Sequence, residues 1–203
     1  MTAEVTPKGY HRHPNGGGLV ADTASVAPGA RVTGNARVDG DAVIDGGASV
    51  YGGARVYGSA RIGVNARIGV NARIGGDARI GGNAQIYGDA WIGGNAQIYG
   101  DAWIGGTARI GGDAGVLTSR HYLTYGPVGS EDRTVTLYRT VGGGHRIVAG
   151  CWDGTCDELA ARIATPKQAW PDVDKADRER WKADYEAMLV AFRVRANEWE
   201  VES

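Results

Sequence analysis

Aliphatic residues recur at every sixth position along roughly half of the chain. They run without a gap from Val26 to Val116, and an alanine stands two positions before each of them. Side chains alternate between the two faces of a strand, so the alanine and the aliphatic residue of each hexad point to the same side. A strict period of six with fixed small and apolar positions is typical of a solenoid whose short strands wind into a parallel β-helix.

The polar positions of each hexad predict its corners. Pairs such as Gly34-Asn35, Gly40-Asp41 and Gly82-Asn83 follow the apolar positions. Glycine and asparagine tolerate positive φ, and asparagine and aspartate favour turns. Each hexad therefore predicts a strand of about four residues and a corner, and three hexads predict a triangular turn of about 18 residues. The whole tract corresponds to about five turns.

Outside this tract the period of six is absent. Residues 134–140 and 146–152 alternate as strands around three glycines, which predicts a β-hairpin. Residues 1–18 end in Asn-Gly-Gly-Gly and predict a flexible leader or a cap over the N-terminal end of the solenoid. The expected parts are thus a leader or cap at 1–18, a β-helix at 19–117 and a small α+β domain at 118–203.

Two helices are expected in the last part. Thr155 and Glu158 have the spacing of a capping box, which predicts a short helix through about Ala164. A long amphipathic helix is expected from about Asp172 to Asn197. Its apolar stripe consists of Trp181, Tyr185, Met188, Leu189 and Phe192.

Composition changes this picture little. Over the 203 residues, 22 Lys and Arg balance 23 Asp and Glu, which argues against overall attraction to nucleic acid or to an anionic membrane. No apolar run reaches the length of a signal peptide or a membrane span. Cys151 and Cys156 are too few for a disulfide framework or a zinc site. We therefore expect a cytoplasmic protein with reduced thiols and no bound metal.

The repeated Ala-x-Ile-Gly-Gly-Asn/Asp hexads resemble those of the hexapeptide-repeat superfamily. This resemblance implies that the β-helix is left-handed and that three chains associate as a parallel homotrimer. The string from Tyr122 to Ser130 and the string from Gly150 to Leu159 resemble a small domain behind hexapeptide repeats in phage and prophage proteins. That second resemblance implies a phage or prophage setting and no particular mechanism.

The best-known members of the superfamily are acyltransferases that use acetyl-CoA or acyl carrier protein, with a catalytic histidine beside a loop that leaves the coil. Residues 19–117 contain no histidine and no interruption of the period. A general base near neutral pH is usually a histidine, so His121 and His145 are the remaining catalytic candidates. The zinc-binding histidines of the related γ-class carbonic anhydrases have no counterpart in the coil.

Arginine is the recurrent outward residue of the hexads. Adding 18 residues moves one turn along the same wall, which gives a ladder of Arg37, Arg55, Arg73, Trp91 and Arg109. The middle of the prism carries an arginine belt that consists of Arg61, Arg67, Arg73 and Arg79. Glycines at the second outward position are expected to leave its guanidinium groups uncovered. The candidate ligand-binding residues are Arg55, Tyr57, Arg61, Arg67, Arg73, Arg79, Trp91 and Trp103.

Stacked arginines about 5 Å apart repel each other by roughly 1 kcal/mol even in water, so something should compensate them. Corner aspartates such as Asp77 and Asp89 are one answer, together with solvent and counterions. A subunit interface near Val64 and Val70 is a second. An anionic ligand is the third, because arginine matches phosphate or carboxylate, and aromatic residues such as Tyr99 stack on a base or ring.

Three functional hypotheses follow. The leading one is a non-catalytic trimeric binding protein of phage type that needs no cofactor and holds an anionic small molecule, such as a nucleotide, or a protein partner. The second is acyl transfer from acetyl-CoA through His121 or His145, and the third is a purely structural assembly module.

Residues 126–130 lack the lysine and helix of a phosphate-binding P-loop and predict a turn.

Overall fold

The structure is a computed structural model that describes residues 6–129 and 132–201. The chain divides into two compact units, Met1–Ser119 and Arg120–Ser203. The first is a parallel β-solenoid of about five turns, and the second is an antiparallel four-stranded sheet with a long C-terminal helix. The predicted fold class is therefore confirmed.

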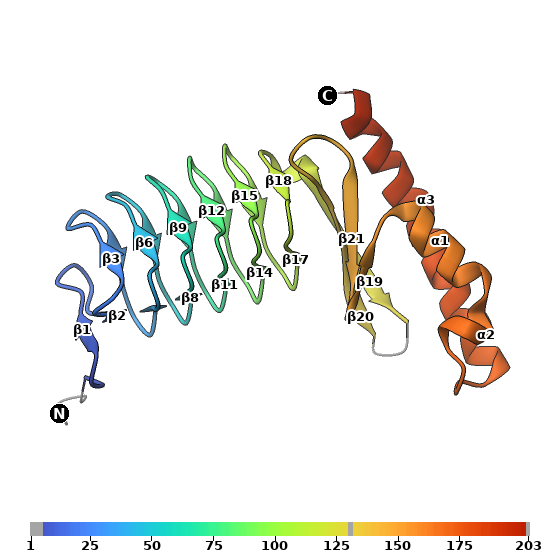
Figure 1. The fold of residues 1–203 in the computed structure, drawn as a ribbon, viewed down its shortest axis with the longest axis horizontal. Helices are drawn as coiled ribbons and strands as arrows, with labels where there is room; N and C mark the ends of the chain where they lie inside the picture. The colour runs from blue at the N-terminus through green and yellow to red at the C-terminus, as the bar shows by residue number, and fades with distance from the viewer. Residues whose placement is uncertain (1–5, 130–131, 202–203) are drawn as a thin grey trace. The chain divides into compact units, whose positions relative to one another are not determined.

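The solenoid has three walls, whose turns are stacked side by side in Figure 1. The seven-strand wall contains β1 (Tyr10–Arg12), β2 (Leu19–Ala21), β5 (Arg37–Val38), β8 (Arg55–Val56), β11 (Arg73–Ile74), β14 (Trp91–Ile92) and β17 (Arg109–Ile110). The five-strand wall contains β4 (Arg31–Val32), β7 (Ser49–Val50), β10 (Arg67–Ile68), β13 (Gln85–Ile86) and β16 (Trp103–Ile104). The six-strand wall contains β3 (Ser25–Val26), β6 (Val43–Ile44), β9 (Arg61–Ile62), β12 (Arg79–Ile80), β15 (Gln97–Ile98) and β18 (Gly115–Val116).

The period of six places the core as the sequence predicts. Each strand pairs in parallel with the strand one turn later, so that Arg73 lies opposite Trp91 and Ile74 opposite Ile92. From Ala30 onward the alanine and aliphatic columns are 0–1% exposed. The regular strands are two residues long instead of about four, because most of each hexad is used for the corner.

Residues 6–18, within the expected leader or cap, include a strand that contacts the solenoid. β1 pairs antiparallel with β2, and Asn15 donates a side-chain hydrogen bond to the Ala30 carbonyl. The Tyr10 hydroxyl donates to Asp39 at 2.7 Å and accepts from Arg37. These contacts hold Tyr10 and Asn15 against the first turns of the solenoid.

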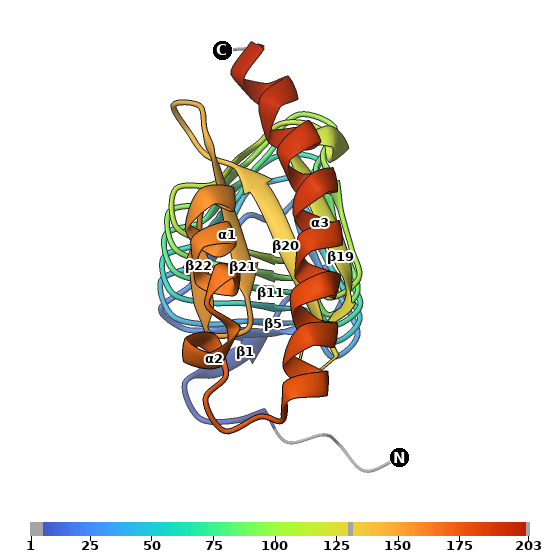
Figure 2. The same ribbon diagram turned by 90° about the vertical axis from the view of Figure 1, so that its right-hand side faces the viewer.

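The second unit begins within a 3₁₀ turn, Ser119–His121. Its antiparallel sheet has the order β19 (Tyr122–Val128), β20 (Arg133–Arg139), β21 (His145–Ala149) and β22 (Trp152–Gly154). The helices are α1 (Cys156–Ala164), α2 (Pro166–Ala169) and α3 (Lys175–Val201). Figures 1 and 2 show α1 and α3 side by side on one face of this sheet.

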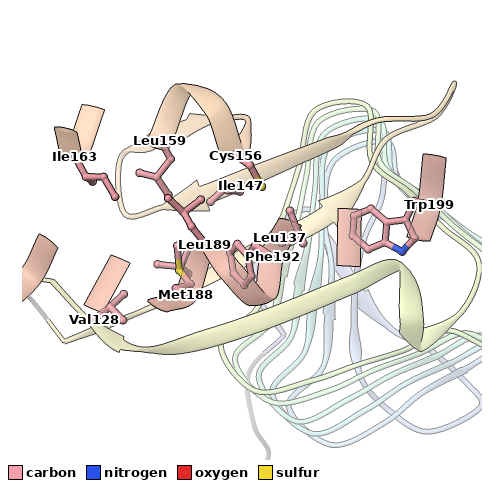
Figure 3. Close-up of a cluster of buried hydrophobic side chains, with 11 residues drawn as sticks. Val128, Leu137, Ile147, Cys156, Leu159, Ile163, Met188, Leu189, Phe192 and Trp199 are labelled. Atoms are coloured by element: carbon pink, nitrogen blue, oxygen red, sulfur yellow. The ribbon is translucent and has the colours of Figure 1, made fainter. Parts of the chain in front are cut away.

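The core of this unit lies between the sheet and the helices (Figure 3). Met188, Leu189 and Phe192 of the predicted stripe are 0–4% exposed, and Trp199 extends the stripe at 1%. The Trp199 indole nitrogen donates to the Arg120 carbonyl at 3.0 Å. The long helix thus packs on its own chain.

Local differences from the sequence expectation concern strand ends. The predicted hairpin is present as β20 and β21. The predicted strand 146–152 ends at Ala149, and Gly150, at φ +65°, starts a turn into β22. The capping box of Thr155 and Glu158 is confirmed. The turn expected at 126–130 is wrong for residues 126–128, which belong to β19. Gly129 lies in a turn, and Ser130 lies outside the described residues.

Candidate functional site

The solenoid distributes the eight predicted ligand-binding residues over three walls. Arg55, Tyr57, Arg73 and Trp91 lie on the seven-strand wall, where Arg73 is paired with both Arg55 and Trp91. Arg67 and Trp103 lie on the five-strand wall. Arg61 and Arg79 lie on the six-strand wall, directly paired in β9 and β12. The arginine belt therefore encircles the solenoid, and the eight residues do not form one site.

On the seven-strand wall, aromatic rings fill the space that the glycines leave. A Cβ atom added at Gly75 would collide with the Tyr57 ring, and one added at Gly93 would lie 2.6 Å from the Trp91 ring. The Trp91 indole nitrogen donates to the Tyr57 hydroxyl at 3.1 Å. Aromatic rings therefore occupy the space over these glycines, while Arg55 and Arg73 remain exposed.

The five-strand wall has a similar aromatic covering. The Tyr51 ring occupies the space above Gly69, and edge-to-face contacts join Tyr51 to Tyr87 and Tyr87 to Trp103. The Tyr87 hydroxyl donates to the Gln85 side chain at 2.5 Å. Burial, followed by the hydrogen bond to Tyr87, raises the pKa of Tyr51 to about 12, so its hydroxyl stays protonated at neutral pH.

The six-strand wall differs because its glycine pair is not fully covered. Gly63 and Gly81 form the floor of a hollow of about 250 Å³, which is flanked by Arg61 and Arg79. The Tyr99 ring closes one end, 3.0 Å from the position of a Cβ atom on Gly81, and Asp45 lines the hollow from the preceding turn. We call this feature the six-strand hollow.

Sequence reasoning named Arg61 and Arg79 as ligand residues and Tyr99 as a stacking residue. It did not name Asp45 as a lining residue, and it treated Gly63 and Gly81 only as positions that leave the arginines uncovered. The signal was present in the spacing, since residues 45, 63, 81 and 99 are successive steps of 18 along the same wall.

The two arginines of the hollow form no ion pair with a described residue, although Asp45 lines the same hollow. Both are exposed, and neither side chain makes a hydrogen bond or an ion pair with any residue that the structure describes. Neither Asp77 nor Asp89 forms an ion pair with an arginine of the belt within the described residues. By contrast, Arg37 on the seven-strand wall is paired with Asp39 at 2.7 Å.

Both catalytic candidates of the second unit are engaged in structural contacts. His121 is 7% exposed and contacts the Trp199 ring edge to face. His145 is half-buried, and its Nε2 atom accepts a hydrogen bond from the Cys156 backbone N–H at 3.0 Å, at the start of α1. Burial lowers the pKa of His145, although Glu200 and Asp157 act in the opposite direction. A neutral imidazole that accepts this hydrogen bond caps a helix.

The thiols and the carboxylates suggest no other chemistry. Cys151 and Cys156 are free thiols, and burial raises the pKa of the Cys156 thiol to about 11. Among residues 6–129 and 132–201, no three His, Cys, Asp or Glu side chains come together as a metal site. Within the same ranges, no helix has the length and apolar character needed to cross a membrane.

Comparison of the chain with protein families, with curated proteins and with solved structures finds no match. Function must therefore be inferred from the geometry and charge of the hollow.

Proposed function

We propose that this protein is a non-catalytic binding protein whose six-strand hollow holds an anionic small molecule. The observation that carries this proposal is that Arg61 and Arg79 are adjacent and exposed, and that their side chains form no hydrogen bond or ion pair with a described residue. Neighbouring strands lie about 4.8 Å apart, and two such charges repel each other by roughly 1 kcal/mol in water. An anion between them would turn this repulsion into attraction.

The hollow favours an anion that also has a ring. Guanidinium groups bind phosphate or carboxylate oxygens in pairs, and the Tyr99 ring offers a surface for stacking. A nucleotide combines both features. Residues 122–164 resemble domains of phage and prophage proteins. On this basis, the proposed role is the sequestration of a host nucleotide in the cytoplasm.

The first test is a calorimetric titration of the protein with nucleoside monophosphates, nucleoside diphosphates and inorganic phosphate. Arg79→Ala should weaken nucleotide binding by about tenfold or more, because a hydrogen bond to a charged group contributes about 1.5–3 kcal/mol. Arg31→Ala is the matched control, because Arg31 is exposed on the five-strand wall, outside the hollow. Equal affinity in the two variants would exclude the hollow as the site.

The second test changes the shape of the hollow and leaves its charge intact. Gly63→Ala would place a methyl group on the floor, 3.4 Å from the Ile80 carbonyl oxygen, and should weaken binding without unfolding the protein. Gly105→Ala is the control, since Gly105 has the same hexad position and open space around it. If both variants bind like the wild type, the ligand does not enter the hollow.

The proposed assembly is a parallel homotrimer. Val64 is 56% exposed and Val70 is 49% exposed, and both occupy corners where glycine is the usual residue. Burial between subunits would account for these apolar groups. Native mass spectrometry of the wild type should show a trimer, and the double variant Val64→Asp, Val70→Asp should be monomeric. A monomeric wild type would refute the proposed trimer.

The other two hypotheses predict different results. Acyl transfer requires a histidine nitrogen that can take up a proton from the acceptor, whereas Nε2 of His145 already accepts from the Cys156 N–H and His121 is buried against Trp199. A purely structural module predicts no saturable ligand at the hollow and equal behaviour of Arg79→Ala and Arg31→Ala.

A further inference from the structure

The second unit contains a separate hollow between its sheet and its helices, with a volume of about 190 Å³. Its floor consists of buried apolar side chains, among them Val128 from β19, Leu159 and Ile163 from α1, and Val135 from β20. Figure 3 shows Leu159, Ile163 and Val128 at the end of the core cluster away from Trp199. We call this feature the sheet–helix hollow.

Aromatic rings form one side of the sheet–helix hollow. Trp170 stacks on Tyr185 with ring centroids 5.9 Å apart and an interplanar angle of 22°. Trp170 also contacts Trp181 edge to face at 5.7 Å, which fixes its orientation from a second direction. A flat apolar group entering the hollow would therefore meet rings that are already held in place.

The rim of the hollow is cationic. Arg133 and Arg162 both line it and are exposed, and none of the described residues that line it is acidic. The Arg162 side chain forms no hydrogen bond or ion pair with any described residue. An apolar, ring-lined floor beneath a positively charged rim is complementary to a flat apolar body that carries one negative group.

The volume limits the size of that body. A cavity of about 150 Å³ accommodates benzene, so the sheet–helix hollow matches a single ring with a short acidic substituent. We propose that the sheet–helix hollow is a binding site for a monocyclic aromatic carboxylate. The carboxylate pairs with Arg162 at the rim, and the ring lies against Trp170, Tyr185 and the aliphatic floor.

The hollow contains its own reporter. Cys151 lines it and is exposed, whereas Cys156 is buried. Because thiolates are the reactive species, a maleimide or aromatic disulfide reagent should label Cys151 first. A ligand in the hollow should slow that labelling in a saturable way.

The experiment measures the rate of Cys151 labelling in the full chain at increasing concentrations of benzoate, benzamide and acetate. We expect saturable protection by benzoate. The half-protecting concentrations of benzamide and acetate should be higher by about tenfold or more, because benzamide lacks the charge and acetate lacks the ring. Arg162→Gln should raise the half-protecting benzoate concentration by about tenfold. Lys167→Gln, which removes an exposed charge outside the hollow, should leave it unchanged.

Two kinds of result would overturn the proposal. One is unsaturable or equal protection by all three probes, and the other is an unchanged benzoate response in Arg162→Gln. Ala149→Leu, which should fill the hollow, provides a second variant that retains the charge. Arg79→Ala alters only the solenoid, so retained benzoate protection in that variant separates this site from the six-strand hollow.

Discussion

Val70 has a backbone conformation that a β-branched residue rarely adopts. Its φ is +57°, at a corner position where Gly52, Gly76 and Gly88 have φ values of +64° to +69°. The left-handed region costs roughly 1–2 kcal/mol for a residue with a Cβ atom. The neighbouring corner differs, because there the positive φ falls on Asn65 and leaves Val64 unstrained.

We therefore predict that Val70→Gly is about 1 kcal/mol more stable than Val64→Gly, because both variants lose the same proposed subunit contact and only Val70→Gly relieves backbone strain. Urea denaturation followed by circular dichroism measures the change. Val64→Gly is the matched control and should be neutral or destabilising. A stability change of equal size in both variants would contradict the explanation from φ.

Single residues also show how far the site could be predicted. The arginine ladders follow from adding 18 to a residue number, and the strand pairing confirms them. The aromatic covering does not follow from spacing, because it depends on side-chain direction. Tyr57 lies over Gly75 in the following turn, whereas Tyr99 lies over Gly81 in the preceding turn.

Among the elements, the best predictions rest on strong local signals. The capping box places the start of α1 at the correct residue. β19 escaped prediction because Gly126 and Pro127 weaken a strand pattern, and a bulge between Tyr125 and Val128 accommodates them. The link from His145 in β21 to the first turn of α1 joins residues of different elements, and no linear motif encodes it.

This link predicts a pH dependence of α1. Burial lowers the pKa of His145 below its ordinary value, so the unfolded chain takes up a proton that the folded chain does not. Stability from His145 is thus complete above the ordinary pKa of about 6.5 and is lost as the pH falls towards the lower folded value. We expect hydrogen exchange in α1, corrected for intrinsic rates, to lose protection over that range.

His145→Gln provides the comparison, because its side-chain oxygen can accept the Cys156 hydrogen bond without titrating. The variant should reduce the pH dependence of α1. His13, which lies in the other unit and whose pKa is also lowered by burial, supplies the control variant His13→Gln. A pH profile of α1 that changes with His13 and not with His145 would contradict the assignment.

At the scale of the whole solenoid, two periods have different roles. The period of six keeps Ala and Ile inside, so any whole number of hexads preserves the core. The period of 18 decides which outward residues become neighbours, as in Arg61 and Arg79. Folding therefore depends on the shorter period, and the six-strand hollow depends on the longer one.

Deletion of residues 69–74 separates the two periods. The deletion joins Ile68 to Gly75 and keeps every remaining core position, so a cooperative unfolding transition and the β-rich circular dichroism spectrum should persist. It also moves Arg61 opposite Gln85 and Arg79 opposite Arg55, which dismantles the hollow. Nucleotide binding should fall at least as far as in Arg79→Ala. A folded deletion variant with wild-type affinity would place the ligand elsewhere, and an unfolded one would show that the hexad is not an independent unit of this solenoid.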